Sequence, residues 1–304
     1  MRDTSNPEAV TANHRSLLFL PASVVADPSH PLPDYYDRCA AERLPAEFRP
    51  DVFILDLEDS VPFADRARGC RDAASFIERV SIGTTTRLFL RVTGTDTFRE
   101  AELRLAAQPA IAGIILPKVE RDTVDVIASG FLEIGKPVWP IIETAKGFLH
   151  KGEIVRFVRA RQADDVPVCV ILGRDDLAAS LRIDRDSLVV EKFGAFFLDF
   201  VCACRAHGCD AIGPVFNAPD NAHGLLEELT ALFMVGFTGA LSVFPQQVRD
   251  VNRAFTTPDA LRARYMSIRA ALTKAHESGV GWTLYEGRKY DTADLAYIDY
   301  VLSR

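Results

Sequence analysis

Eight short apolar stretches, each followed by a helix-forming segment, recur along residues 15–257 and constrain the fold more than any other feature of the chain. They predict strands over 17–21, 52–57, 87–92, 112–116, 138–142, 166–172, 211–216 and 240–244. Continuous apolar strands joined by helices are typical of a parallel sheet that is covered on both faces. Eight consecutive units favour a closed (β/α)8 TIM barrel of the α/β class.

The alternative arrangement of the same units is an open, doubly wound sheet. That fold carries a glycine-rich phosphate turn after its first strand. Here the first predicted strand runs into Pro21, Ala22 and Ser23, so this turn is missing from the sequence. We therefore predict a TIM-barrel catalytic domain over residues 15–257.

The connections between the strands have helical composition. They predict helices over 34–44, 64–80, 97–107, 120–129, 147–161, 189–207 and 222–235, with others beginning near residues 177 and 246. Thr97 and Glu100 stand at the spacing of a capping box, in which each side chain bonds the other's backbone N–H. This spacing predicts that Thr97 is the N-cap of its helix.

The two ends of the chain fall outside the repeating pattern. Residues 1–14 are polar and predict a disordered N-terminal arm. Residues 258–304 predict a helical extension, with a helix over 259–276, a turn or hairpin over 279–288 and a last helix over 294–302. This extension is short for a core of its own, so we expect it to pack on the barrel or on a neighbouring subunit.

The composition argues against several classes of partner. The 304 residues carry a net charge of -7, which disfavours binding to nucleic acid or to an anionic membrane surface. No apolar run approaches the roughly 18 residues of a membrane-spanning helix, and the N-terminal segment lacks the apolar core of a signal peptide. Cys202, Cys204 and Cys209 fit no zinc spacing well, and Cys169 lies inside a predicted strand as a core thiol would. We expect a cytoplasmic protein.

Acidic side chains follow two neighbouring predicted strands. Glu143 comes directly after the strand over 138–142, and Asp175 and Asp176 follow the strand over 166–172. Parallel strands of a barrel bring their carboxyl ends to one rim, and Mg²⁺ prefers one or two carboxylates together with water and substrate oxygens. Glu143 and Asp176 are therefore candidate Mg²⁺ ligands. A helix N-cap or a salt bridge is the alternative role for each acid.

Other strands bring further charges to the same rim. Glu58 and Asp59 follow the second strand, Arg91 lies in the third, and Lys118 follows the fourth. Arg91 could hold a substrate carboxylate through two parallel hydrogen bonds, or it could form a structural ion pair with Glu58 or Asp59. Lys118 could form a Schiff base, but the surrounding acids should keep it protonated, which favours the metal.

Together these motifs carry a resemblance over nearly the whole chain. The matching segments begin at Arg15 (RSLLFLPAS), Asp51 (DVFILDLEDSV), Leu88 (LFLRV), Gly113 (GIILPKVE), Pro140 (PIIETAKG) and Gly173 (GRDDLAASL), with weaker matches from Phe244 and Gly279. The chain resembles the HpcH/HpaI aldolase and citrate lyase β-subunit family, in its acyl-CoA lyase-like branch. This resemblance implies a homo-oligomeric (β/α)8 barrel, often a trimer, that uses Mg²⁺.

The resemblance also implies an activity and the residues that support it. Members cleave or form the carbon–carbon bond of 3-hydroxyacyl thioesters such as citryl-CoA, malyl-CoA or citramalyl-CoA. By position, Glu143 and Asp176 match the metal ligands, and Arg91 matches the arginine that binds the 2-oxo acid. Glu58 and Asp59 match acids of the inner site, so that these two acids and Arg91 are the predicted catalytic residues.

Further candidates surround this set. Arg15, in the first matching segment, and Lys118 are predicted to bind substrate. Arg66 and Arg71 are candidate contacts for a CoA phosphate, with a solvated helix face as the alternative. The chain departs from the family pattern at Thr93, among other positions, so its thioester side matches the family less closely than its metal side.

The sequence therefore leads to the hypothesis of a Mg²⁺-dependent lyase that releases a 2-oxo acid and an acyl thioester by retro-Claisen or retro-aldol chemistry. Two alternatives stay open at this point. One is a citrate lyase β-type subunit that acts only with an acyl-carrier partner. The other is a metal-dependent aldolase that acts on free 2-oxo acids.

Overall fold

The computed structural model describes residues 14–80 and 85–303, which fall into two compact units. One unit is His14–Phe255 and the other comprises residues 256–303. The predicted disordered arm over 1–14 lies outside the described residues except for His14, which is buried in the first unit.

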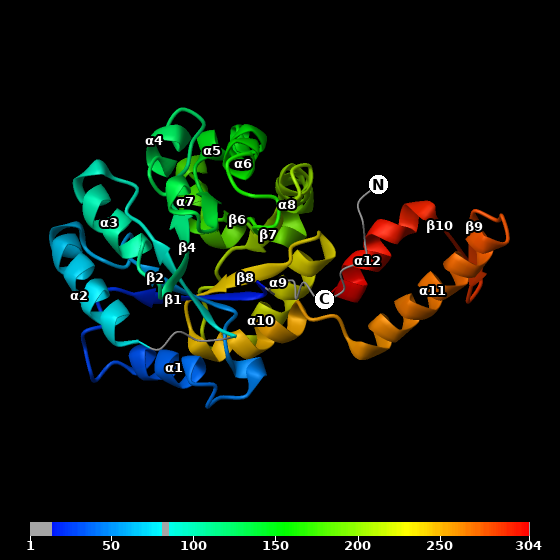
Figure 1. Ribbon diagram of the computed structural model, residues 1–304, viewed down its shortest axis with the longest axis horizontal. Coiled ribbons are helices and arrows are strands. Elements are labelled where there is room, and N and C mark those ends of the chain that lie inside the picture. The colour runs from blue at the N-terminus through cyan, green and yellow to red at the C-terminus, as the bar shows by residue number, and fades with distance from the viewer. Residues whose placement is uncertain (1–13, 81–84, 304) are drawn as a thin grey trace. The chain divides into compact units, whose positions relative to one another are not determined.

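The larger unit is a closed barrel of eight parallel strands in sequence order, with β8 pairing back onto β1 (Figure 1). The strands are β1 (Ser16–Pro21), β2 (Val52–Asp56), β3 (Arg87–Arg91), β4 (Ile111–Leu116), β5 (Val138–Ile142), β6 (Cys169–Leu172), β7 (Asp210–Gly213) and β8 (Gly239–Ser242). The predicted TIM barrel is confirmed. The sixth and seventh strands are shorter than predicted, because Pro167 and Pro214 lack the N–H that a central strand donates.

Helices follow the strands and lie outside the barrel (Figure 1). They are α1 (Pro31–Ala40), α2 (Arg66–Arg79), α3 (Arg99–Ala106), α4 (Val124–Ala128), α5 (Ala145–Leu149), α6 (Lys151–Arg159), α7 (Arg174–Leu181), α8 (Val190–Arg205), α9 (Ala222–Met234) and α10 (Val248–Ala254). The helix predicted over 147–161 is two helices that meet at His150. The capping box at Thr97 does not form, because Thr97 lies in a 3₁₀ turn and α3 begins at Arg99.

Large aromatic side chains pack together inside the barrel. Phe89 of β3 and Trp139 of β5 lie with their ring centroids 4.2 Å apart, and both are fully buried. Gly113 of β4 makes room for this layer, since a Cβ there would clash with the Phe89 ring. The strand ends that carry polar residues are therefore supported by a densely packed interior.

The smaller unit has an organisation of its own. It consists of α11 (Asp259–Glu277), the antiparallel hairpin of β9 (Trp282–Tyr285) and β10 (Arg288–Asp291), and α12 (Leu295–Ser303). The hairpin turns through Glu286 and Gly287, both with positive φ, as a two-residue type I′ turn requires. Ile268, Leu272 and Ile298 are buried together, so the expectation that this segment lacks a core was wrong. Among the described residues, every helix is too short or too polar to cross a membrane.

Candidate active site

The carboxyl ends of the barrel strands surround a pocket of about 310 Å³. Its charged lining comprises Asp56, Asp59, Arg91, Glu143, Arg174, Asp175 and Asp176. Phe19 of β1 and Leu241 of β8 form part of an apolar wall. The structure thus brings four of the predicted site residues, Asp59, Arg91, Glu143 and Asp176, into one pocket, because the parallel strands before them end at one rim.

Arg91, the last residue of β3, is anchored to Asp56, the last residue of β2. Its Nε and Nη2 donate to the two Asp56 carboxylate oxygens at 2.6 and 2.8 Å. The backbone N–H groups of Glu58 and Ser60 donate to the same carboxylate at 2.9 and 3.2 Å. Burial acts to raise the pKa of Asp56, but the charge of Arg91 and these hydrogen bonds prevail and lower it. Asp56 is therefore a fixed anion that holds Arg91 in place.

The remaining side of the Arg91 guanidinium faces the predicted inner acids. Its Nη1 lies 3.4 Å from Glu58 Oε2 and 3.9 Å from Asp59 Oδ2. The Phe19 ring lies against the guanidinium with its centroid 4.7 Å from Cζ. The ion pairs with Glu58 and Asp59 are thus present as expected, but Asp56 is the main partner and takes the two-pronged contact predicted for a substrate.

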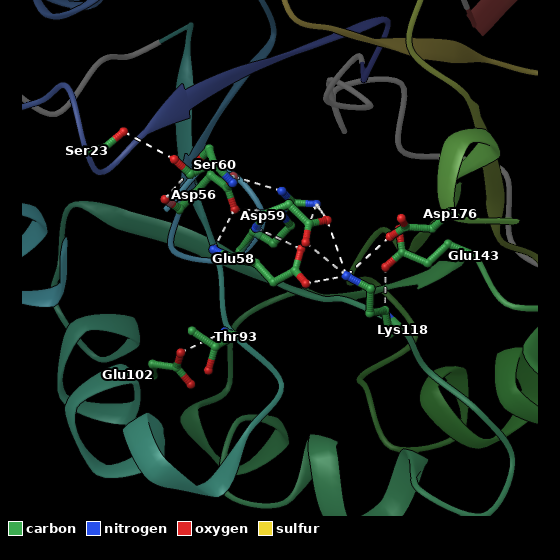
Figure 2. A network of polar contacts seen from close by, with 11 residues as sticks. Ser23, Asp56, Glu58, Asp59, Ser60, Thr93, Glu102, Lys118, Glu143 and Asp176 are labelled. Atoms are coloured by element: carbon green, nitrogen blue, oxygen red, sulfur yellow. Dashed lines mark hydrogen bonds and ion pairs between the residues drawn. The ribbon is translucent and has the colours of Figure 1, made fainter. Parts of the chain in front are cut away.

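Lys118 connects the inner acids to the predicted metal ligands. Its Nζ lies 2.5 Å from Glu58 Oε1, 3.0 Å from Asp59 Oδ1 and 3.2 Å from Asp176 Oδ2 (Figure 2). Burial acts to lower the pKa of Lys118, but its carboxylate neighbours prevail and raise it. The amine is therefore held in the charged form, which disfavours a Schiff base.

The backbone of Lys118 is strained in a way that serves the site. Its φ of +50° lies in the left-handed region, which costs a non-glycine residue on the order of 1 kcal/mol. In this conformation the Lys118 N–H donates to Glu143 Oε1 at 2.7 Å. The strain is thus offset by the contacts of the Lys118 side chain and of its backbone N–H. The strained conformation points this N–H at Glu143, a candidate metal ligand.

Glu143 follows β5 and is almost completely buried, with 4% of its surface exposed. Its carboxylate lies directly over Gly173, because a Cβ built on Gly173 would come within 2.5 Å of Glu143 Oε2. Burial raises the pKa of Glu143 to about 8, although Arg91 and the Lys118 N–H act in the opposite direction. A carboxylate in this environment favours either a proton or a bound cation.

Asp175 and Asp176 lie in the first turn of α7, and Figure 2 shows Asp176 beside Glu143. Within residues 14–80 and 85–303, Asp175 Oδ1 and Asp176 Oδ2 are buried oxygens that accept no hydrogen bond, although Lys118 lies near the second. The other Asp175 oxygen accepts from Asn217 Nδ2 at 2.8 Å. Under-bonded carboxylate oxygens next to Glu143 fit a hard divalent cation such as Mg²⁺.

Arg174 is a pocket residue that the sequence reasoning missed. It is buried, its Nη1 donates to Glu228 Oε1 at 2.6 Å, and its Nη2 donates to the Val215 carbonyl at 2.5 Å. Its position between Gly173 and the paired acids was a usable signal. Glu228 lies on α9, 54 residues further along the chain, and carried no such signal.

Two predicted CoA contacts lie outside the pocket lining. Arg66 and Arg71 belong to α2, where Arg66 is half-buried and Arg71 is exposed. The Arg66 guanidinium lies over the Phe63 ring, 5.4 Å from its centroid. Both residues are therefore separate from the charged cluster, and their predicted phosphate contact stays a prediction.

Arg15 is not brought to the site. It precedes β1 and so lies at the amino end of the barrel, whereas the pocket is at the carboxyl end. Its backbone N–H and its Nε donate to Asp51 Oδ2 at 2.7 and 3.0 Å, and its Nη2 donates to Asp51 Oδ1 at 2.8 Å. This placement corrects the prediction that Arg15 binds substrate, because its side chain joins the starts of β1 and β2 instead.

Comparison with protein families matches residues 41–245 to HpcH/HpaI aldolase/citrate lyase. The chain is 30% identical over 243 residues to a (3S)-malyl-CoA thioesterase of Cereibacter sphaeroides, covering 78% of this chain and 80% of the relative. It is 28% identical over 287 residues to an L-malyl-CoA/beta-methylmalyl-CoA lyase of Rhodobacter capsulatus, covering 84% and 88%.

Solved structures also share this fold. One is the protein CitE from Mycobacterium tuberculosis in complex with magnesium, acetoacetate and coenzyme A. It is 23% identical, aligns with a TM-score of 0.67, and the match covers 96% of this chain and 98% of that chain. The family match over most of the barrel, together with the 30% identity above, leads to one conclusion: the chain belongs to the HpcH/HpaI aldolase/citrate lyase family of carbon–carbon lyases.

Proposed function

We propose that this enzyme is a Mg²⁺-dependent lyase for a 3-hydroxyacyl-CoA thioester of the malyl-CoA, citramalyl-CoA or citryl-CoA type. The products would be a 2-oxo acid and an acyl-CoA, formed by retro-Claisen or retro-aldol chemistry. One observation carries the proposal: Glu143 and an under-bonded oxygen of Asp176 line the same pocket as Arg91. The relative named L-malyl-CoA/beta-methylmalyl-CoA lyase gives further support.

Glu143 and Asp176 would hold the metal ion, with Asp175 next to them. When bound, Mg²⁺ would act as a Lewis acid towards the carboxylate and neighbouring oxygen of the 2-oxo acid portion. The Lys118 N–H holds Glu143 in position at 2.7 Å, and the Lys118 amine lies 3.2 Å from Asp176 Oδ2. Lys118 would therefore position both ligands rather than bond covalently to substrate.

Arg91 would orient the substrate carboxylate. Because Asp56 occupies its Nε and Nη2, the substrate would meet the Nη1 side, which now lies 3.4 Å from Glu58 Oε2. A substrate carboxylate would take the place of the Glu58 contact there. The ion pair with Asp56 fixes the plane of the Arg91 guanidinium before the substrate binds. Arg91 therefore loses little conformational entropy on binding.

Glu58 is our candidate for proton transfer. Burial raises its pKa to about 7, and a general base is most effective when its pKa lies near the working pH. Glu58 would accept the proton of the substrate hydroxyl as the carbon–carbon bond breaks, while the Lys118 amine holds Glu58 Oε1 at 2.5 Å. The electrons of that bond leave with the thioester fragment as an enolate, which is then protonated.

Thioester hydrolysis is a second candidate. The relative that is 30% identical is named (3S)-malyl-CoA thioesterase, and the same pocket would hold a malyl group for either reaction. The lyase breaks a carbon–carbon bond, whereas the thioesterase adds water to the thioester carbonyl and releases free CoA. The two reactions on malyl-CoA therefore differ in every product: glyoxylate and acetyl-CoA against malate and CoA.

The oligomeric state, the cellular compartment and the CoA phosphate contacts of the enzyme are also part of the proposal. We propose a homo-oligomer, a trimer or larger, because Trp282 and Leu284 of the β9–β10 hairpin are exposed apolar side chains that a neighbouring subunit would cover. All six cysteines lie among the described residues and none is joined in a disulfide, which supports the proposal of a reducing cytoplasm. Arg66 and Arg71 remain the proposed phosphate contacts if CoA itself is the acyl carrier.

A product assay tests the function directly. The purified full-length chain is incubated with malyl-, citramalyl- and citryl-CoA, with and without Mg²⁺, and both 2-oxo acid and free thiol are measured. Mg²⁺-dependent release of 2-oxo acid without free thiol supports the lyase. Free thiol without 2-oxo acid supports the thioesterase. Turnover only after an acyl-carrier protein is added, or only on free acids, favours one of the two alternatives and contradicts the proposal.

A further inference from the structure

A second group of metal-ligand side chains lies at the opposite end of the barrel from the pocket. His14 precedes β1 by two positions, and Cys169 and Asp210 are the first residues of β6 and β7. Cys169 and Asp210 are register partners in neighbouring strands. One ligand atom from each of the three residues, a ring nitrogen, the sulfur and a carboxylate oxygen, lies within 4.8 Å of the other two.

The surroundings hold these side chains in a defined arrangement. His14 and Cys169 are 1% and 0% exposed, and Asp210 is half-buried. The His14 ring packs edge-on against Trp139, with the ring centroids 4.7 Å apart. Arg87, the first residue of β3, is close enough to interact electrostatically with Cys169.

We propose that His14, Cys169 and Asp210 form a zinc site that ties β1, β6 and β7 together at the amino end of the barrel. Zn²⁺ takes histidine nitrogen, thiolate sulfur and carboxylate oxygen in a tetrahedral arrangement. Mg²⁺ is held by oxygen ligands, so the two ends of the barrel select different metals. Three protein ligands leave one position for water. Its position inside a predicted strand had indicated only that Cys169 packs in the core. In this proposal Cys169 also binds the metal.

The geometry requires only a small closure around the ion. Zinc bonds of roughly 2.0–2.3 Å place tetrahedral ligand atoms about 3.3–3.8 Å apart. The present separations of up to 4.8 Å would close by about 1 Å when the ion binds. Asp210 Oδ1 also accepts from Arg205 Nη1 at 2.5 Å, a hydrogen bond of the kind that orients a ligand carboxylate from outside the metal sphere.

Cobalt(II) is the probe that separates this site from the carboxylate pocket. A cobalt–thiolate bond gives a near-ultraviolet charge-transfer band, whereas cobalt bound only by oxygen does not. The full-length protein is titrated with Co²⁺ and the band is followed. We expect a band that saturates at one ion per chain and disappears when excess Zn²⁺ displaces the cobalt.

Matched variants assign the band to this cluster. Cys169→Ser should abolish it, while Cys209→Ser, which alters a neighbouring buried thiol, and Glu143→Gln, which alters the pocket, should both retain it. Asp210→Asn keeps the shape of the half-buried side chain and should weaken Co²⁺ binding about tenfold or more, which tests the site even if Cys169→Ser fails to fold. A missing band in the unaltered protein, or an unchanged Co²⁺ affinity in Asp210→Asn, would overturn the proposal.

Discussion

The two ends of the barrel both carry arginine–aspartate pairs, but their charge balance differs. At the amino end, Arg15 donates three hydrogen bonds to Asp51. At the carboxyl end, Asp56 satisfies Arg91 in a similar way, yet further acids line the same pocket. An ion pair between strand ends therefore serves the fold at both ends, and a surplus of under-bonded carboxylates marks the end that carries the candidate active site.

The surplus acids should matter for turnover far more than for stability. Replacing Glu143 with Gln, or Asp176 with Asn, should lower kcat/KM by about 1,000-fold or more, because the metal loses a ligand and its charge stabilisation. The melting temperature should stay within a few degrees, since each change keeps the shape of the side chain and relieves the repulsion between neighbouring acids. Steady-state kinetics at saturating Mg²⁺ and thermal unfolding measure the two effects. Near-normal turnover in both variants would place the chemistry elsewhere.

Breaking the arginine pairs should have a large effect on stability. Asp56→Asn leaves the buried Arg91 without its main partner and should lower the free energy of unfolding by about 3–5 kcal/mol. The matched change Asp51→Asn, at the more exposed Arg15, should cost less, about 1.5–3 kcal/mol. Denaturant titration of both variants measures the difference. Equal losses would show that the two ends hold their arginines equally tightly.

Space beside Glu143 should control metal affinity. In Gly173→Ala the new Cβ would come within 2.5 Å of Glu143 Oε2, so the carboxylate must move and Mg²⁺ affinity should fall about tenfold. Gly152→Ala is a matched control, since a Cβ there would meet nothing within 4 Å. Isothermal titration with Mg²⁺ compares the two. A Gly173→Ala variant that binds like the control would remove Glu143 from the metal site.

At low pH the protein should lose the stabilisation that the charged Asp56 carboxylate provides at the carboxyl end of the barrel. Although burial opposes it, the pKa of Asp56 is lowered by Arg91 and by hydrogen bonds. This stabilisation is present above the unfolded-state pKa of about 3.9 and is lost as the pH falls through the lower folded-state pKa. Melting curves below about pH 4 should therefore decline more steeply for the unaltered protein than for Asp56→Asn. Parallel declines would contradict the role given to this carboxylate.

The sequence alone was sufficient to predict the location of those site residues whose position depends only on strand direction. Glu143, Asp176 and Lys118 follow successive strands, and parallel strands must end at one rim, so their meeting needed no knowledge of register. The same rule should have excluded Arg15, which precedes its strand and therefore lies at the other end.

Contacts that depend on register and on distant helices were beyond the sequence. Asp56 meets Arg91 because β2 and β3 pair these two residues directly, and a shift of one position would have moved the side chains to opposite faces. Glu228 reaches Arg174 from α9, a contact set by how that helix packs on the barrel. The Thr97 capping box failed because a 3₁₀ turn displaced the start of α3.

Our proposal for the pocket requires that Glu143 and Asp176 share one divalent ion. Mn²⁺, which prefers oxygen ligands, is a suitable probe, and its binding can be counted by electron paramagnetic resonance in the unaltered chain and in the two single variants. We expect one tightly bound Mn²⁺ per chain and a loss of affinity of at least about tenfold in both Glu143→Gln and Asp176→Asn. Unchanged Mn²⁺ affinity in either variant would show that the two carboxylates do not share an ion.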